Sequence, residues 1–230
     1  MTTSPVSVGL TLRLERVRES IGAACRRAGR DPASVTLIAV SKTHPVAAIR
    51  EAMAAGVAEF GENRVQEALQ KLDELAAFGR PPPVHLIGHL QTNKVRAAAG
   101  RFAILHGIDS ARVLRAVSAA APAPAPARIM IEVNVAGEAT KFGVPPGDLA
   151  AMVDLARTLP NIALEGLMTV APEVADAESI RPVFVTLRRL AEAHGLSALS
   201  MGMTNDFETA IEEGATHIRI GRAIFGERMA

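Results

Sequence analysis

A lysine follows an apolar segment that has the composition of a buried strand. The segment is 35–40 (VTLIAV), and Lys42 follows it after one serine, within the sequence SKTHP. The chain has only four lysines among its 25 basic residues, so most of its positive charge is arginine. A desolvated lysine can lose its proton near neutral pH, and the neutral amine can form a Schiff base with an aldehyde. Lys42 is therefore a candidate for covalent chemistry, and the alternative is a lysine that reaches solvent from a strand end.

Two segments near the C-terminus carry groups that can bind an anion. Ser200 and Thr204 supply hydroxyls before the helical pattern at 205–213, and Thr204 or its neighbour can cap that helix. Gly221 allows close approach of the backbone, and Arg222 begins another turn. The alternative is ordinary helix capping and a turn glycine. Together with a Schiff-base lysine, these segments suggest a ligand that is a phosphorylated aldehyde.

Pyridoxal 5'-phosphate (PLP) fits this description, because it needs an amine for its aldehyde, a cradle for its phosphate and a partner for its ring nitrogen. Arg219 lies two residues before the candidate phosphate glycine and could reach the ring nitrogen. A guanidinium cannot accept a proton, so it would keep that nitrogen unprotonated and weaken the cofactor as an electron sink. The alternative is an ion pair of Arg219 with Glu165 or Asp206.

Strand-like apolar segments alternate with helical patterns along the whole chain. Several of the helical segments begin at a proline or end at a glycine, as helices commonly do. The eight strand-like segments are 35–40, 58–60, 84–87, 103–108, 128–135, 164–170, 199–203 and 217–220, and helical spacing is found over 45–55, 64–78, 147–159, 175–194 and 205–213.

Eight such units in 230 residues predict a parallel (β/α)8 TIM-type barrel that forms a single domain over 1–230. A doubly wound open sheet is the structural alternative. A helix over 10–28 precedes the first strand and only 222–230 follow the last, so this helix or a short C-terminal turn should cover that sector. The Pro/Ala-rich stretch 119–127 is expected to be a loop. Such barrels carry functional groups at the C-terminal ends of strands and often bind phosphate after strands seven and eight.

The composition limits the classes of function. The net charge of +1 gives no electrostatic pull toward nucleic acid or membrane surfaces. One cysteine, Cys25, excludes an intramolecular disulfide framework and suits a reducing compartment. The N-terminus lacks a signal pattern, and no apolar run reaches the ~18 residues of a membrane span. We therefore expect a cytoplasmic protein that binds neither nucleic acid nor membrane and has no metal site.

The sequence resembles the pyridoxal phosphate homeostasis proteins (YggS/PROSC type) over nearly its whole length. The combination of segments is specific, although no single one would be. The matching segments are AVSKTHP at 39–45, FGENRVQE at 60–67, HLIGHLQTNK at 85–94, VNVAGEATKFG at 133–143, GLMTV at 166–170 and LSMGMTNDFETAIEEGATHIRIGRAIFGER at 199–228.

The resemblance implies a barrel like the N-terminal domain of alanine racemase, without the C-terminal β-domain of that enzyme. It implies a role in vitamin B6 and amino- and keto-acid homeostasis without established catalysis. The expected recipients of the cofactor are apo-enzymes, and the missing domain favours a monomer. The resemblance places PLP on Lys42 as a Schiff base, its phosphate on Ser200, Thr204, Gly221 and Arg222, its ring nitrogen opposite Arg219, and Asn63 beside it.

Three positions depart from the family pattern. Arg64 stands where the family usually has tyrosine, Arg222 where it often has a small hydroxyl residue, and Val84 where it often has tryptophan. The Arg222 departure replaces one side-chain contact to phosphate with a guanidinium or a backbone N–H.

Two enzymatic alternatives stand beside a carrier of PLP. A weak PLP-dependent amino-acid racemase or lyase needs a proton-transfer group on each face of its substrate. The chain has no tyrosine to act as the second base, and His89, Asp206 or Glu62 would have to substitute. A barrel aldolase that uses Lys42 without any cofactor is the third possibility. We expect no catalytic residues.

Overall fold

The computed structural model describes residues 8–122, 124–138, 140–172 and 176–226. Within them a helix precedes eight alternating strand and helix units. The strands are β1 (Thr36–Val40), β2 (Glu59–Glu62), β3 (Val84–His89), β4 (Leu105–Ile108), β5 (Ala127–Glu132), β6 (Ile162–Met168), β7 (Ala198–Ser200) and β8 (His217–Ile220). The helices are α1 (Val8–Arg27), α2 (Val46–Ala54), α3 (Val65–Ala76), α4 (Val95–Ala98), α5 (Ala111–Ala120), α6 (Leu149–Thr158), α7 (Arg181–Ala193), α8 (Phe207–Glu212) and α9 (Arg222–Phe225), with short 3-10 turns at Pro32–Ser34, Thr92–Lys94, Pro146–Asp148 and Ala177–Ile180.

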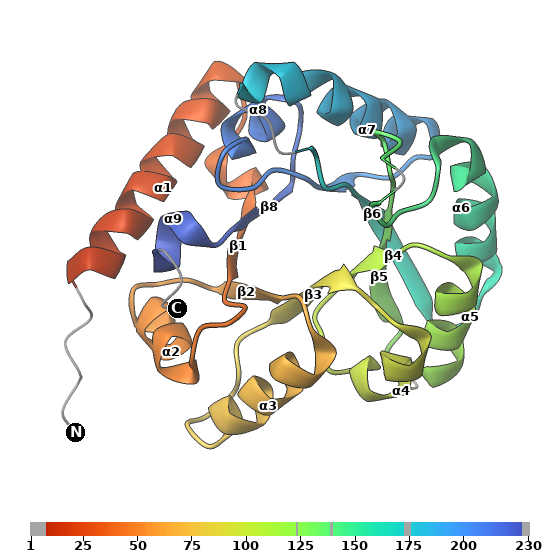
Figure 1. The fold of residues 1–230 in the computed structure, drawn as a ribbon, viewed down its shortest axis with the longest axis horizontal. Helices are drawn as coiled ribbons and strands as arrows, with labels where there is room; N and C mark the ends of the chain where they lie inside the picture. Colours follow the sequence, from red (N-terminus) through yellow and green to blue (C-terminus); the bar gives the residue numbers. More distant parts are fainter. Residues whose placement is uncertain (1–7, 123, 139, 173–175, 227–230) are drawn as a thin grey trace.

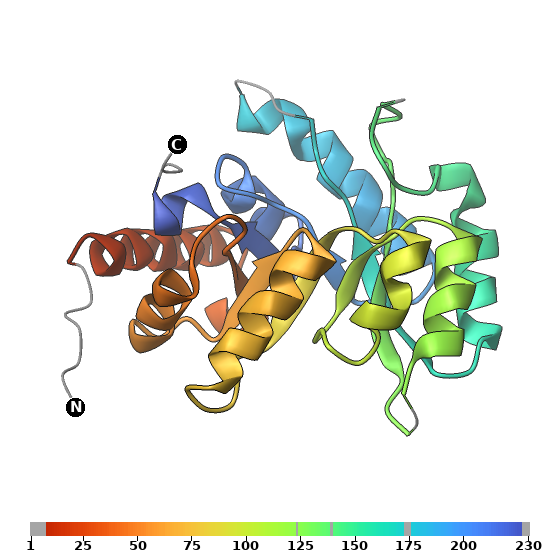
Figure 2. The ribbon, with the colours of Figure 1, turned by 60° about the horizontal axis from the view of Figure 1, so that its bottom comes forward.

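The eight strands form a closed parallel barrel in sequence order, with the helices outside it (Figure 1). β1 closes the ring by pairing with β8, in a register that runs from Thr36 opposite His217 to Ala39 opposite Ile220. The barrel prediction is confirmed, and the open doubly wound sheet is excluded. Figure 2 shows α3, α4 and α5 side by side along the outer wall.

The N-terminal helix covers the seam where the barrel closes. α1 lies against α8 and α9, and its Leu10, Leu14, Val17 and Ile21 are buried. The Arg13 Nε donates a hydrogen bond of 2.8 Å to the carbonyl oxygen of Ile224 in α9. α1 and the single turn α9 thus cover the sector that a long final helix would occupy, as the sequence suggests.

The protein has two buried regions, one between the strands and the helices and one inside the ring of strands, and they differ in polarity. A large apolar layer fills the space between the strands and the helices, as expected for this fold. Inside the ring the apolar cluster is small, built on Ile104, Met130 and Met168. Polar side chains share that inner space, since His85, His106 and Arg219 are all buried. An inner core with this polarity is where functional groups are expected.

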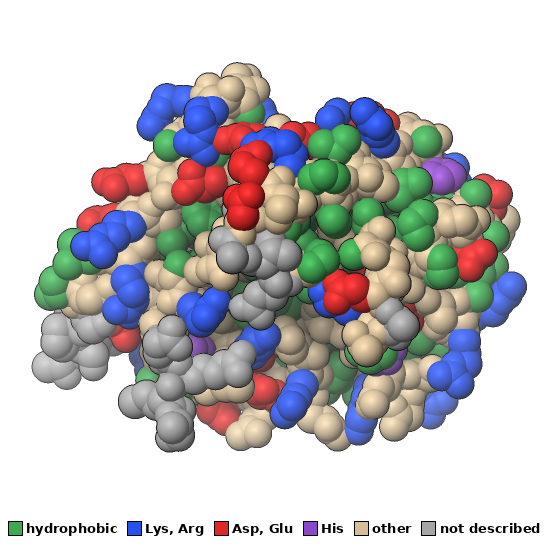
Figure 3. Space-filling view, turned by 45° about the horizontal axis from the view of Figure 1, so that its top comes forward, with side chains coloured by type: hydrophobic (Ala, Val, Ile, Leu, Met, Phe, Trp, Pro, Cys, Tyr) green, Lys and Arg blue, Asp and Glu red, His purple; other side chains and the backbone are tan. Residues whose placement is uncertain are grey.

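The expectation of a Pro/Ala-rich loop over 119–127 holds only for its middle: α5 extends to Ala120, β5 begins at Ala127, and 121–126 connect them, with residue 123 outside the described part of the chain. Cys25 is a buried α1 residue, and burial raises the pKa of its thiol. No helix in the described ranges is long and apolar enough to cross a bilayer. Figure 3 shows acidic, basic and apolar side chains interspersed over one face.

Candidate functional site

The candidate lysine lies in a tight turn at the C-terminal end of β1. Lys42 and Thr43 form this turn, which a hydrogen bond of 3.0 Å from the His44 N–H to the Ser41 carbonyl oxygen closes. Lys42 is half-buried. Thr43 has a φ of 67°, a left-handed conformation that β-branched residues rarely adopt. The backbone next to the candidate lysine is therefore strained.

A buried cluster of charged residues from β2 and α3 lies beneath this turn. The Lys71 Nζ bonds to the Ser41 carbonyl oxygen at 2.9 Å, to Glu62 Oε1 at 2.8 Å and to Glu67 Oε1 at 2.7 Å. Glu67 Oε1 also accepts the Thr43 N–H at 2.6 Å, and Glu62 Oε1 accepts the Ser41 hydroxyl at 2.6 Å. We call Ser41, Glu62, Glu67 and Lys71 the turn-anchoring cluster.

Burial and pairing act in opposite directions on the two carboxyls of this cluster. Burial raises the pKa of Glu62 above its usual value, against the opposing hydrogen bonds from Lys71 and Ser41. Burial also acts to raise the pKa of Glu67, but the hydrogen bonds from Lys71 and Thr43 outweigh it and lower the pKa. Glu67 is therefore held as a carboxylate that can accept the Thr43 N–H.

On β2, Asn63 follows the strand end and is half-buried. A Cβ at Gly88 would lie 2.4 Å from the Asn63 carbonyl oxygen, so only glycine allows β3 to approach this backbone. Arg64 is exposed at the N-cap of α3. Asn63 thus lies at the same barrel end as Lys42, whereas the arginine that replaces the family tyrosine points to solvent.

Arg219 lies inside the barrel and is 4% exposed. Its NH1 donates to the Ser200 Oγ at 2.6 Å, and its NH2 donates to the Thr169 carbonyl oxygen at 2.8 Å. Burial lowers the pKa of Arg219 to about 10, against the opposing charges of Asp206 and Glu132. Among the described residues no ion pair within 4 Å joins Arg219 to Glu165 or Asp206; Glu165 pairs with Arg128, whereas Asp206 is near enough for its charge to act on the pKa of Arg219.

Ser200 is fully buried, and its hydroxyl contacts barrel residues on two sides. Besides Arg219, its Oγ lies 2.9 Å from His106 Nδ1. His106 Nε2 lies 2.9 Å from His85 Nδ1, and His85 Nε2 lies 2.7 Å from Glu59 Oε2. Burial lowers the pKa of His106 well below its usual value. These contacts connect Arg219 to Glu59 across the barrel interior. The sequence pattern did not predict them.

Thr204 lies in the turn between β7 and α8 and is half-buried. The expectation that Thr204 or Asn205 caps the following helix is wrong, because the N-cap is Asp206 and α8 begins at Phe207. The Asp206 Oδ1 accepts the Met203 N–H, which adds a turn before the helix. Thr204 is thereby left in the loop at the barrel end.

Gly202 fixes the start of this loop. Its φ is 94°, and a Cβ there would lie 2.6 Å from the Ala210 Cβ. Any other residue would be both strained and blocked, so the path of the chain from β7 into α8 depends on this glycine.

On the neighbouring strand, Gly221 follows β8 and is the N-cap of α9, which Arg222 begins. A Cβ at Gly221 would lie 3.4 Å from the Val40 carbonyl oxygen at the end of β1. Since β1 pairs with β8, Gly221 and Arg222 lie on the strand end next to that of Lys42. The lysine and this half of the expected phosphate site therefore share one sector of the barrel.

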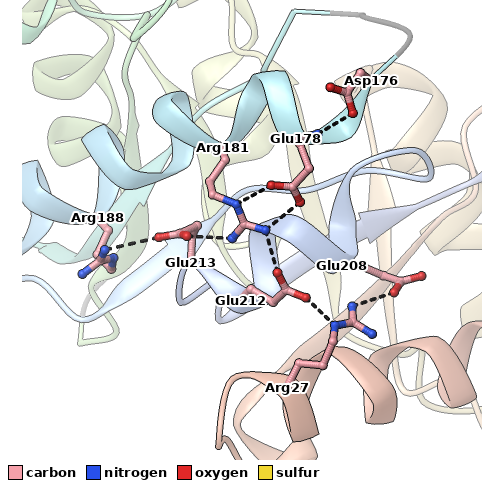
Figure 4. A network of polar contacts seen from close by, with 8 residues as sticks. All are labelled: Arg27, Asp176, Glu178, Arg181, Arg188, Glu208, Glu212 and Glu213. Carbon is pink, nitrogen blue, oxygen red and sulfur yellow. Dashed lines mark hydrogen bonds and ion pairs between the residues drawn. The ribbon is translucent and has the colours of Figure 1, made fainter.

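Ion pairs connect α8 to its neighbours (Figure 4). Arg181 of α7 bonds to Glu212 Oε2 at 2.7 Å and to Glu213 Oε1 at 2.8 Å. Arg27 of α1 bonds to Glu212 Oε1 at 2.6 Å and to Glu208 Oε2 at 2.8 Å. α8 is short, and this network connects it to α1 and α7.

A second polar group lies at the ends of β3, β4 and β5. His89 Nδ1 lies 2.7 Å from Asp109 Oδ2, and the His89 ring stacks on Phe142 with centroids 4.0 Å apart. Burial, assisted by the charge of Asp109, raises the pKa of Glu132 to about 7. Within the described ranges no group of three or more His, Cys, Asp or Glu side chains could hold a metal ion.

The sequence matches the family model of the alanine racemase N-terminal domain over residues 12–229. It is 45% identical over 218 residues to a pyridoxal phosphate homeostasis protein of Pseudomonas aeruginosa, with 94% of each chain covered. A protein of the same name from Escherichia coli K12 is 40% identical over 94% of this chain and 95% of its own. The chain belongs to the pyridoxal phosphate homeostasis protein family.

Solved structures agree with this assignment. PipY of Synechococcus elongatus with PLP bound is similar with a TM-score of 0.82 and 36% identity, covering 94% of this chain and all of PipY. Alanine racemase of Corynebacterium glutamicum has a TM-score of 0.67 at 20% identity, and this chain covers 62% of it. The second likeness shows the barrel fold alone. The family match and the fold confirm the family and the barrel that the sequence resemblance predicted.

Proposed function

We propose that this protein binds pyridoxal 5'-phosphate through a Schiff base on Lys42 and acts as a carrier in vitamin B6 and amino- and keto-acid homeostasis. The observation that carries the proposal is the placement of Lys42 beside Gly221 and Arg222, on paired strands at one barrel end. PipY, a relative with the same fold, binds PLP. In this proposal the uncharged form of the Lys42 amine would add to the aldehyde carbon, and the aldehyde oxygen would leave as water with the two amine hydrogens.

The surrounding residues provide the rest of the binding site in this proposal. Thr204, Gly221 and Arg222 hold the phosphate through a hydroxyl, backbone N–H groups and a guanidinium. Arg219 faces the ring nitrogen from inside the barrel, and Asn63 lies beside the ring. Ser200 is part of the proposed site, and its hydroxyl already contacts Arg219 and His106, which favours a role in orienting Arg219.

A weak PLP-dependent racemase or lyase is the second candidate, and one observation favours it. The pairing of His89 with Asp109 orients an imidazole at the barrel end where the Lys42 turn lies. A histidine oriented by a carboxylate is a common general base. The homeostasis name shared by the relatives favours the carrier over the enzyme.

The first test is an absorbance spectrum of wild type beside Lys42→Ala, each with and without added PLP. We expect a near-visible band in wild type that is absent from the variant, and borohydride reduction should fix the label on Lys42. No band in wild type with excess PLP would overturn the proposal and favour the cofactor-free aldolase. Turnover of D- or L-amino acids by wild type that is lost in the His89→Ala variant would favour the enzyme over the carrier.

A further inference from the structure

We propose that Glu67 and Lys71 are positioning residues that hold the Lys42 turn for reaction with the aldehyde. The inference rests on the proposed covalent role of Lys42. In this role the two α3 side chains would act on the backbone of the turn, and so set the direction of the lysine that binds the aldehyde.

Both peptide groups that flank Lys42 are bonded to α3 side chains one helical turn apart. The Ser41 carbonyl oxygen, on the N-terminal side, accepts from Lys71 Nζ at 2.9 Å. The Thr43 N–H, on the C-terminal side, donates to Glu67 Oε1 at 2.6 Å. Since Lys71 and Glu67 also bond to each other at 2.7 Å, the two supports form one unit. The Cα of Lys42 is thus fixed from both sides.

The turn that is fixed in this way is not one the chain adopts readily. Thr43 has a φ of 67°, and such a conformation persists only where the surroundings impose it. The N–H that Glu67 accepts belongs to this same strained residue. Removal of the acceptor would therefore release the turn to ordinary conformations, with a different direction for the Lys42 side chain.

The cluster beneath the turn is also poorly suited to a purely structural role. Glu62 is 1% exposed, and its Oε2 has no hydrogen-bond partner among the described residues. A buried carboxyl with an unpaired oxygen disfavours folding, and apolar side chains would stabilise α3 better. Strain and an unpaired polar atom at one place are typical of functional sites.

The same contacts occupy the side-chain nitrogen of Lys71. An ammonium has three N–H donors, and those of Lys71 have three acceptors, namely the Ser41 carbonyl, Glu62 and Glu67. Lys71 therefore has no lone pair to offer an aldehyde while the cluster is intact. The anchor of the turn is a lysine that cannot compete with Lys42 for the aldehyde.

The test compares Glu67→Gln with Glu67→Met in the full chain freed of ligand. The glutamine keeps an oxygen that can accept the Thr43 N–H, and the methionine has none. Asp73→Asn is the matched control, because Asp73 lies on the solvent side of α3 in an exposed pair with Arg101. The measurements are the rate at which the near-visible band appears with added PLP, its pH profile, and the lysine labelled after borohydride reduction.

We expect Glu67→Met to slow band formation by about 10-fold or more, because a displaced nucleophile loses much of the advantage of orientation. Glu67→Gln should recover most of the rate, and Asp73→Asn should match wild type. Wild-type rate and sole labelling of Lys42 in a folded Glu67→Met protein would overturn the inference. Equal slowing in Glu67→Gln and Glu67→Met would also overturn it, because the Thr43 acceptor would then be irrelevant.

Lys71→Met serves as a second variant, with folding checked by circular dichroism. This change leaves the Glu62 and Glu67 carboxyls without their cation and can therefore unfold the protein. If Lys71→Met does not fold, the comparison of Glu67→Gln with Glu67→Met still tests the inference. The proposed function and the inference fail differently. If wild type itself forms no label on Lys42, the proposed function fails. If wild type is labelled and Glu67→Met behaves identically, only the positioning role fails.

Discussion

Arg219 and Ser200, on neighbouring strands, are joined inside the barrel by a hydrogen bond of 2.6 Å from NH1 to Oγ. The guanidinium belongs to a side chain that is only 4% exposed, and an unpaired donor on a buried cation costs more free energy than one on an exposed cation. The bond therefore orients the residue proposed to face the cofactor ring. It also connects the proposed cofactor site to the buried histidines His106 and His85.

Ser200→Ala should destabilise the protein without ligand by about 1–3 kcal/mol, because a buried guanidinium N–H loses its acceptor. Urea unfolding measures this loss. Ser118→Ala, which removes a hydroxyl bonded to the Pro160 carbonyl far from the site, is the control and should cost less. Unchanged stability together with weakened binding of PLP would show instead that Ser200 serves the phosphate.

Gly202→Ala should destabilise the protein by more than about 1 kcal/mol and weaken PLP binding. The added methyl meets Ala210, and the positive φ disfavours alanine, so the loop of Thr204 must move. Gly147→Ala is the matched control, because a Cβ there meets nothing within 4 Å. Affinity for PLP measured by fluorescence titration should fall only in the first variant, and an unchanged affinity would remove this loop from the binding site.

Glu132→Gln should stabilise the protein without ligand at pH 8 by about 1–3 kcal/mol. Burial raises the pKa of Glu132 from 4.5 to about 7, so the unfolded chain releases this proton first as the pH rises. The carboxyl therefore lowers the free energy of unfolding progressively between about pH 4.5 and 7. Unfolding of wild type and variant at pH 5 and 8 gives the difference. A gain that does not grow with pH would contradict the assigned pKa.

Arg181→Met should lower stability by about 1–2 kcal/mol, because this guanidinium joins three carboxylates in one network rather than a single surface pair. Arg101→Met removes an exposed single pair with Asp73 and should cost less than about 1 kcal/mol. The comparison is made by thermal unfolding in low salt and in 1 M salt. Equal losses in the two variants would mean that the network does not hold α8.

The sequence predicts the barrel well because its signals are local and repeated. Continuous apolar strands such as 35–40, and glycines at helix ends, indicate the order of elements without any knowledge of contacts. The same logic fails for α4, a single turn at Val95–Ala98 that has too few residues to show a helical period. The cap of α8 is also missed, since several adjacent polar residues can cap a helix and the chain uses the last of them.

The site could be predicted only where position along a strand decides it. Lys42, Gly221 and Arg222 follow strand ends, and parallel strands in a barrel bring those ends together. The interior bond between His106 and Ser200 joins residues 94 positions apart and depends on which side of each strand faces inward. The anchoring of the Lys42 turn by Lys71 likewise depends on the rotation of α3, which no short motif encodes.

The pairing of the first strand with the last has a consequence for synthesis of the chain. Lys42 leaves the ribosome well before Gly221 and Arg222, because 178 residues separate it from Gly221. Until β8 and α9 are made, one edge of β1 has no partner strand, and α1 has no α9 to pack against. The amine proposed to react is therefore present on an unfinished barrel while the strands from β2 to β8 are made. In the proposed function, the ability to select a phosphorylated aldehyde arises only once β8 and α9 are in place.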